Sequence, residues 1–333
     1  MPNSSHSTSF PLSVPLLLGA AILAFAALPW WADKGLVFLA GIVLVQIVFA
    51  LSFNLTFGLT GLVSFGQAAF FAAGAYASAW LARTAPDVPF VLTLVFGAAV
   101  GAALAFIIGL VALRRASGIY FAILTLALGQ LVYTVIGKTT ALGREDGLTG
   151  IARPRLDFGL FTIDLSAGDA YYYFILAVSI VMIAALWWVW YGSLGRILTA
   201  IRQEPERARF LGVNVRRYRE YAFLISGAMT ALAGAVMAPW GQIITPMIAH
   251  WSYSALPILF CLLGGSRQFW GPAVGAIVFA GLEHATRTMI GVADLVVGGA
   301  LLLVVLAMPG GILGTLVSLR SRVTAKKLEV GHE

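Results

Sequence analysis

Residues 35–82 read GLVFLAGIVLVQIVFALSFNLTFGLTGLVSFGQAAFFAAGAYASAWLA and contain no charged side chain. A helix needs about 20 consecutive apolar residues to cross the hydrocarbon core of a membrane, so this 48-residue stretch can hold two such helices. Gly58 and Gly61 supply a turn between them. The stretch therefore predicts two membrane spans, near residues 36–57 and 61–82.

The same pattern recurs along the 333-residue chain, in which 60% of the residues are hydrophobic and 11% are charged. A soluble domain carries about 25% charged residues, so this composition excludes a soluble enzyme, a disordered protein and a nucleic-acid-binding protein. We expect an all-α, polytopic membrane bundle of about ten transmembrane helices, near residues 12–31, 36–57, 61–82, 88–113, 118–137, 171–191, 220–240, 253–265, 271–290 and 293–313.

The distribution of basic residues orients these spans. A cytoplasmic N-terminus places 14 of the 21 Lys and Arg residues on the cytoplasmic side, as the enrichment of cytoplasmic loops in basic residues requires. We therefore expect both termini in the cytoplasm, and the net charge of +7 then reflects orientation rather than a polyanionic partner. No Lys or Arg precedes residues 12–31, so we expect a retained span there rather than a signal peptide.

Residues 1–318 are expected to form a single transmembrane domain, followed by a basic cytoplasmic tail at 319–333. Residues 97–102 (GAAVGA) and 271–276 (GPAVGA) match at five of six positions and lie in spans of opposite direction. This match predicts an inverted repeat that relates spans two to five to spans seven to ten, a common transporter plan. The single cysteine, Cys261, excludes a disulfide framework, and we expect neither a metal site nor a cofactor.

The loop between the sixth and seventh spans, residues 192–220, holds ten of the 35 charged residues. Helix signals in it predict two short helices, over 196–203 and 205–211, the second with a proline at its start and a glycine after its end. Phe210 and Leu211 add an apolar edge. We expect a docking surface for a cytoplasmic protein; the alternative is a basic loop that lies against anionic membrane lipid.

Polar residues inside membrane spans are costly and tend to face the bundle interior. The third predicted span is also interrupted by glycines, and transporters often bind substrate at discontinuous helices. These features predict a pathway wall formed mainly by the third and fifth spans. Under the alternative, Gln67 and Gln130 only hydrogen-bond neighbouring helices. The pathway candidates are Asn54, Ser64, Gly66, Gln67, Phe70, Gly74, Tyr76, Thr125 and Gln130.

Longer motifs follow one another from the third span to the tenth: GLTGLVSFGQAAFFAAGAYASAWL (58–81), GIYFAILTLALGQ (118–130), GREDGLTGIARP (143–154), GRILTAIRQEPERARFLGVNVRRYREYAFLISGAMTALAGA (195–235), LLGGSRQFWGPAVGA (262–276) and VVLAMPGGILG (304–314). With them the chain resembles the permease subunits of branched-chain amino-acid ABC importers, the LivM-type branch of the LivH/LivM family. It departs from the family pattern at residues 264–267, which read Gly-Gly-Ser-Arg where Gly-Gly-x-Gly is usual, and at Ala152, where proline is frequent. The resemblance therefore leaves the substrate open: it could be leucine, isoleucine or valine, or one of the substrates carried by relatives, which are urea, amides or aromatic acids.

This resemblance implies a multi-pass subunit of a bacterial inner membrane that forms half of a translocation pathway. Its expected partners are a second, LivH-like permease, two cytoplasmic ABC ATPase subunits and a periplasmic or lipid-anchored substrate-binding protein. The chain has no G-x-x-x-x-G-K-[ST] phosphate loop, so ATP would be hydrolysed on a separate subunit and this chain would not be an enzyme.

Two loops then receive expected roles. The loop 192–220 would couple the permease to the ATPases, through Arg196, Ile197, Ile201, Arg202, Glu204, Pro205, Glu206, Arg207, Arg209, Phe210, Leu211 and Gly212. The outer loop 138–170 is predicted to contact the binding protein, with a loop that merely covers the bundle as the alternative. Its contact candidates are Arg144, Glu145, Asp146, Arg153 and Arg155.

A stand-alone, ion-coupled secondary transporter or channel for a small polar solute is the alternative function. Such a protein would need a titratable group at mid-depth in the membrane. The candidate cluster, Glu283, His284 and Arg287, lies near the outer end of the ninth span. Glu283 and Arg287 are four residues apart, so we expect them to form a structural ion pair instead.

Overall fold

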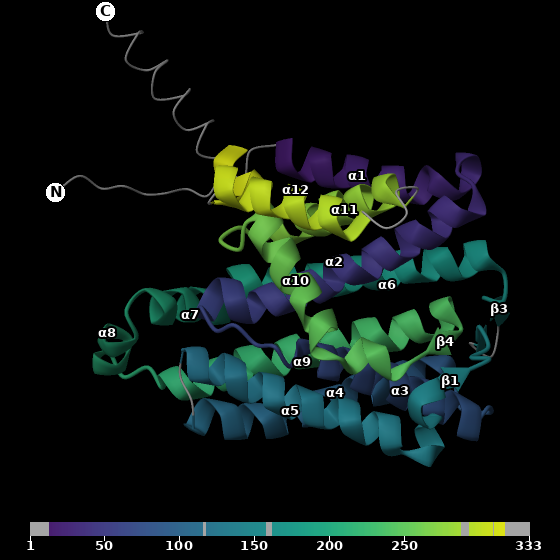
Figure 1. Cartoon of the computed structure of the whole chain (residues 1–333), viewed down its shortest axis with the longest axis horizontal. Helices are drawn as coiled ribbons and strands as arrows, with labels where there is room; N and C mark the ends of the chain where they lie inside the picture. Colours follow the sequence, from purple (N-terminus) through teal and green to yellow (C-terminus); the bar gives the residue numbers. More distant parts are fainter. Residues whose placement is uncertain (1–12, 116–117, 158–161, 288–292, 309, 317–333) are drawn as a thin grey trace, which may run out of the picture.

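The structure is a computed structural model that describes residues 13–115, 118–157, 162–287, 293–308 and 310–316. Over these residues the chain forms twelve α-helices, three 3-10 helices and four short strands (Figure 1). The α-helices are α1 (Ser13–Trp31), α2 (Lys34–Thr60), α3 (Gln67–Thr84), α4 (Phe90–Arg115), α5 (Ile119–Lys138), α6 (Gly168–Tyr191), α7 (Ser193–Gln203), α8 (Pro205–Phe210), α9 (Val215–Gly241), α10 (Trp251–Gly264), α11 (Gly271–Thr286) and α12 (Ala293–Ala307). The 3-10 helices are η1 (Thr140–Leu142), η2 (Arg144–Asp146) and η3 (Pro246–Ala249).

Ten of these helices, all except α7 and α8, overlap the ten spans that the sequence predicts. Among the described residues, α2, α4, α5, α6 and α9 are long and apolar enough to cross a membrane. Shorter apolar stretches lie within α1, α10 and α12. The prediction of a helical, polytopic membrane bundle is therefore confirmed. Ten crossings and cytoplasmic termini stay predictions, and the basic tail 319–333 lies outside the described residues.

The long helices alternate in direction, so their connections gather at two ends of the bundle (Figure 1). We name these the α8 end, where α7 and α8 project, and the β4 end, where the short strands lie. Helix α9 is central and packs against α2, α3 and α4. Small residues permit this close approach, because a Cβ atom at Gly74 of α3 would collide with the backbone of Ala231 in α9.

The two glycine motifs of the expected repeat occupy comparable places. A Cβ atom at Gly97 of α4 would lie 2.7 Å from the carbonyl oxygen of Gly74 in α3. A Cβ atom at Gly275 of α11 would collide with the carbonyl oxygen of Phe260 in α10. Each motif thus packs against the helix that precedes it, as an inverted repeat of α2–α5 onto α9–α12 requires. The repeat itself stays a prediction.

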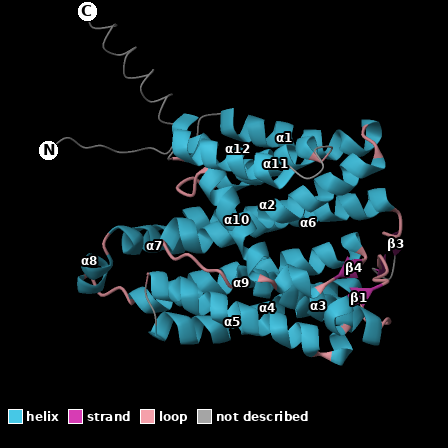
Figure 2. Ribbon diagram, in the orientation of Figure 1, coloured by secondary structure: helices cyan, strands magenta, loops and turns pink. Residues whose placement is uncertain are grey.

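Four short strands are absent from the all-helical prediction (Figure 2). Strand β1 (Leu148–Thr149) pairs with β4 (Ile243–Ile244), and β2 (Arg155–Asp157) pairs with β3 (Thr162–Asp164), both antiparallel. Each strand has only two or three residues, which is too short to produce the alternating pattern by which strands are recognised in a sequence.

Two further details differ from the sequence expectation. The third span begins at Gln67 and not at residue 61, because Gly61 ends α2 with a φ of +74° and the backbone of residues 61–66 is non-helical. The expected ion pair between Glu283 and Arg287 does not form among the described residues. Helix α11 ends at Thr286, and both charged side chains are exposed.

Candidate functional site

A buried polar cluster lies where α3 begins. The Nε2 group of Gln67 donates hydrogen bonds to the hydroxyl oxygens of Ser226, at 2.8 Å, and Thr230, at 2.7 Å, both on α9. The Ser226 hydroxyl in turn donates to the carbonyl oxygen of Ser52 on α2, at 2.6 Å. All four side chains are buried. The cluster therefore joins three helices through side-chain hydrogen bonds at a site closed to solvent.

One acceptor of this cluster has no partner. The Oε1 atom of Gln67 is buried and accepts no hydrogen bond from any described residue, and the same holds for the Oε1 atom of Gln130 on α5. Buried polar atoms in proteins are almost always hydrogen-bonded. Each orphaned oxygen is therefore an unsatisfied hydrogen-bond acceptor inside the bundle.

The non-helical linker 61–66 and the first turn of α3 donate backbone hydrogen bonds to side chains of other helices. The backbone N–H of Phe65 donates to the hydroxyl of Thr125 on α5, at 3.2 Å. The N–H of Ala68, in the first turn of α3, donates to the hydroxyl of Ser254 on α10, at 2.8 Å. The first N–H groups of a helix lack partners within the helix. Side chains of α5 and α10 thus hold the break in the third span in place.

The structure brings four of the predicted pathway residues together at this break: Ser64, Gly66, Gln67 and Thr125. The backbone N–H of Gly66 donates to the Ser64 hydroxyl at 3.3 Å. A Cβ atom at Gly66 would lie 2.9 Å from the carbonyl oxygen of Thr125. A residue with a side chain at this position would therefore push α5 away from the linker.

The other polar candidates lie elsewhere. The side-chain amide of Asn54 donates to the carbonyl oxygen of Gln268 at 3.4 Å, in the connection between α10 and α11. The hydroxyl of Tyr76 donates to the carbonyl oxygen of Ile244 at 3.2 Å, at the β4 end. These two side chains lie toward opposite ends of the bundle and hold connections between elements.

Two apolar candidates serve helix packing. Phe70 contacts Phe223 of α9 edge to face, with ring centroids 5.4 Å apart. Gly74 lies against the backbone of Ala231 in the same helix. Both positions therefore set the distance between α3 and α9.

Sequence reasoning missed three hydroxyl residues of the cluster: Ser226, Thr230 and Ser254. A signal existed for two of them, because Ser226 and Thr230 are four residues apart and so share one face of α9. No such signal existed for Ser254, whose role depends on how α10 packs against α3.

The predicted pair of short helices at the α8 end is present as α7 and α8, with Pro205 in the first turn of α8. The inner face of α7 is buried against the ends of α2 and α6, where Leu198 and Ile201 pack in one cluster with Leu59 and Trp190, and α8 packs against α7 and α9. The partner side chains come from the main bundle, so α7 and α8 are part of its core and not a loose loop.

A polar contact strengthens this attachment. The guanidinium of Arg202 on α7 donates a hydrogen bond to the carbonyl oxygen of Gly58 in the last turn of α2. Partial burial lowers the pKa of Arg202 from its usual range, and the positive charge of Arg267 lowers it further. The charge is thus held at an interface between α7 and the main bundle.

The outer edge of α8 has the opposite character. The side chains of Phe210 and Leu211 are 91% and 78% exposed. Arg207 pairs with Glu204 at 3.3 Å, and Arg209 pairs with Glu206 at 2.8 Å. Two adjacent apolar side chains flanked by charged pairs are thus left uncovered by the described residues at a projecting tip, as at many protein contact sites.

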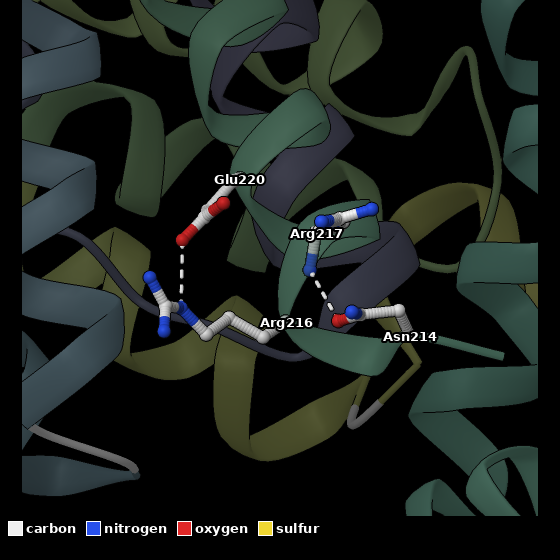
Figure 3. A network of polar contacts seen from close by, with 4 residues as sticks. All are labelled: Asn214, Arg216, Arg217 and Glu220. Carbon is white, nitrogen blue, oxygen red and sulfur yellow. Dashed lines mark hydrogen bonds and ion pairs between the residues drawn. The ribbon is translucent and has the colours of Figure 1, made fainter.

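The connection from α8 to α9 is held by a small polar network (Figure 3). The side-chain oxygen of Asn214 caps α9 by accepting a hydrogen bond from the backbone N–H of Arg217, at 3.1 Å. Arg216 and Glu220, one turn apart, pair at 2.8 Å. N-caps of this kind stabilise a helix start, so the tip is joined to α9 by a defined turn.

The five predicted outer-loop contacts divide into two groups. Arg144, Glu145, Asp146 and Arg155 are exposed at the β4 end. Arg153 is half-buried, with its guanidinium 5.3 Å from the ring centroid of Trp240, so it holds the loop against α9. In the same loop, hydrogen bonds from Ser166 lower the pKa of the Asp164 carboxyl, and Arg155, 3.7 Å away, lowers it further.

The sequence model of one family matches residues 35–306, which hold nearly all of these features. Its description is "Branched-chain amino acid transport system / permease component". The chain belongs to this permease family. Among the described residues of the permease, no group of three or more His, Cys, Asp and Glu side chains could hold a metal ion.

Curated relatives agree with this assignment. The permease is 27% identical to the high-affinity branched-chain amino acid transport system permease protein LivM of Escherichia coli K12, over 90% of this chain and 74% of that protein. The LivM protein of Salmonella typhimurium LT2 gives the same values. The LivH protein of that strain is 29% identical over 40% of this chain and 44% of its own. No solved structure shows significant similarity to the permease.

Proposed function

We propose that this permease is the membrane-spanning subunit of an ATP-driven importer for branched-chain or related amino acids in a bacterial inner membrane. The observation that carries the proposal is the projecting pair α7 and α8. Its tip exposes Phe210 and Leu211, while its inner face is buried in the main bundle. An element exposed at its tip and fixed at its base can receive a force from a cytoplasmic ATPase and pass it to the membrane helices.

The uneven burial of the long helices supports a partner inside the membrane. In α2 and α9 most of the apolar window is buried, whereas in α4, α5 and α6 a third or less is buried. A second, LivH-like permease would cover part of these exposed faces and complete the pathway, and membrane lipid would cover the remainder. Two ATPase subunits would bind at the α8 end, and a substrate-binding protein would bind at the β4 end.

The pathway wall would include the break between α2 and α3. There the linker 61–66 lies beside Thr125 of α5 and leads directly into Gln67 with its orphaned oxygen, and α5 is the least buried of the five long apolar helices. Discontinuous helices supply backbone polar groups to solutes in many transporters. A small movement of the linker would therefore change which polar groups face the pathway.

An ion-coupled secondary transporter is the competing function. It would require a buried titratable group such as a carboxylate at mid-depth, yet none of the buried side chains among the described residues is Asp, Glu, His, Lys or Arg. Glu283, the acid within α11, is exposed in the last turn of that helix. These observations favour the ATP-driven importer.

The deciding experiment reconstitutes the permease with its partners in liposomes. We expect uptake of radiolabelled L-leucine only when the second permease, the ATPases, the binding protein and ATP are all present. Uptake by the permease alone, driven by an ion gradient, would overturn the proposal. Charge reversal at Arg207 and Arg209 tests the docking surface separately: unchanged ATPase co-purification and uptake would show that the ATPase binds elsewhere.

A further inference from the structure

A cavity of about 350 Å³ opens at the β4 end, between the last turn of α5, η2 and η3. Its walls include Tyr133, Lys138, Glu145, Thr245, Pro246 and Met247. Ligand sites in proteins have volumes of roughly 300–1,000 Å³, so the cavity has room for one small molecule. It lies at the opposite end of the bundle from α8 and is separate from the buried cluster around Gln67.

The walls of this cavity are fixed by backbone contacts. Strand β1 pairs with β4, so Leu148 lies opposite Ile244, and a Cβ atom at Gly147 would collide with the carbonyl oxygen of Ile244. The ring of Tyr133 meets the imidazole of His250 edge to face at a centroid distance of 5.3 Å. The aromatic wall and the loop that carries Glu145 are therefore both anchored to the segment 243–250.

One positive and one negative side chain line the cavity without forming an ion pair with each other. Lys138 and Glu145 both line it, both are exposed, and neither forms an ion pair with any described residue. Beside them, Tyr133, Pro246 and Met247 supply an apolar surface. The wall thus presents a cation, an anion and an apolar surface around one small space.

We propose that this cavity is an outer binding site for a free α-amino acid with an apolar side chain. The ligand carboxylate would pair with the Lys138 ammonium, the ligand amine would pair with the Glu145 carboxylate, and the side chain would lie against Tyr133 and Met247. The inference rests on the proposed function, because it places substrate on the permease after the binding protein releases it and before it reaches the break at α3.

A direct binding measurement tests the site without the rest of the importer. The full-length permease in lipid nanodiscs is titrated with L-leucine, and binding is followed by saturation-transfer NMR. Competition with L-leucinamide, which lacks the carboxylate, and with 4-methylpentanoate, which lacks the amine, identifies the groups that are recognised. The variants are Lys138→Met and Glu145→Gln. The matched controls are Arg83→Met and Asp87→Asn, exposed charges at the same end that do not line the cavity.

We expect L-leucine to bind better than either analogue. Each cavity variant should weaken L-leucine binding by about two- to fivefold, since exposed ion pairs contribute modestly. Lys138→Met should also abolish the preference over L-leucinamide, and Glu145→Gln should abolish the preference over 4-methylpentanoate. Both controls should bind like the wild type.

Equal binding of L-leucine by all variants, or no binding by the wild type, would overturn the site while leaving ATP-driven uptake by the complete importer untouched. Conversely, if the cavity binds L-leucine as expected but the complete system shows no ATP-dependent uptake, the importer proposal fails and the site stands. The two failures are therefore distinguishable.

Discussion

Arg202 and Gly58 are 144 residues apart in the chain, and the guanidinium of the first donates a hydrogen bond to the carbonyl oxygen of the second. Gly58 lies in the last turn of α2, directly before the linker 61–66 that leads into α3. A displacement of α7 would therefore act on the linker through one backbone carbonyl. The contact therefore links the proposed coupling helix α7 directly to the proposed pathway break between α2 and α3.

Removing this contact should uncouple ATP hydrolysis from transport. In the reconstituted importer, we expect Arg202→Gln to reduce L-leucine transported per ATP hydrolysed by about tenfold, the effect of roughly 1.4 kcal/mol of lost coupling. ATPase co-purification should persist because the tip of α8 is unchanged. Gln203→Ala, at the exposed neighbouring position, is the control. If Arg202→Gln transports as much L-leucine per ATP hydrolysed as the wild type, the contact with Gly58 does not transmit movement from the ATPase to the pathway.

The exposed tip of α8 should matter for assembly but not for folding. We expect the double variant Phe210→Ala, Leu211→Ala to lose ATPase co-purification, because the two side chains are almost fully exposed and contact little of their own chain. Its thermal midpoint in detergent should stay at the wild-type value. Leu295→Ala, which truncates an exposed leucine on α12, should retain the ATPase. A lowered midpoint in the double variant would mean that the tip supports the fold.

The contact between α3 and α9 should tolerate no added volume. We expect Gly74→Ala to destabilise the permease by about 1–3 kcal/mol, the usual cost of overpacking, because the new methyl group would collide with backbone atoms of Ala231. Thermal unfolding in detergent measures the change. Gly281→Ala is the control, since no heavy atom lies within 4 Å of its added Cβ. Equal midpoints for the two variants would contradict the close packing.

The hydrogen bonds of Gln67 should be coupled to α9. We expect Gln67→Leu to cost about 1–3 kcal/mol, because it leaves buried hydroxyls with fewer partners. In a double-mutant cycle with Thr230→Val, the coupling energy should be about 0.6 kcal/mol, the average for such bonds in a membrane protein. The measurement is again thermal unfolding in detergent. Strictly additive effects would show that the two side chains do not interact in solution.

The sequence predicted the helices well because each depends on local composition. Uncharged windows of about 20 residues located every long helix, and a proline and a glycine located α8. The short β1–β4 pairing was not predictable, because it joins Leu148 to Ile244, 96 positions apart in the chain, and each strand is only two residues long.

The candidate site was predicted in part for the same reason. Gln67 and Thr125 stand out as polar residues in apolar runs, so the sequence indicated them individually. Their partners follow from tertiary packing: the Gln67 amide reaches α9, and Thr125 accepts a bond from the linker and not from its own helix. The prediction of an ion pair between Glu283 and Arg287 was wrong, because a spacing of four residues permits such a pair but does not require it.

Only 22% of the apolar window of α5 is buried within the chain. The stability of the permease therefore depends on the lipid or protein that covers the rest of this helix. A partner that binds only the folded chain adds about 2.7 kcal/mol of apparent stability when its concentration is 100 times the dissociation constant. A thermal unfolding midpoint measured on this chain alone would therefore be lower than the midpoint of the chain bound to such a partner. In a cell that lacks the proposed second permease, this chain would then unfold and be degraded more readily, so the scarcer of the two subunits would limit the amount of the proposed importer.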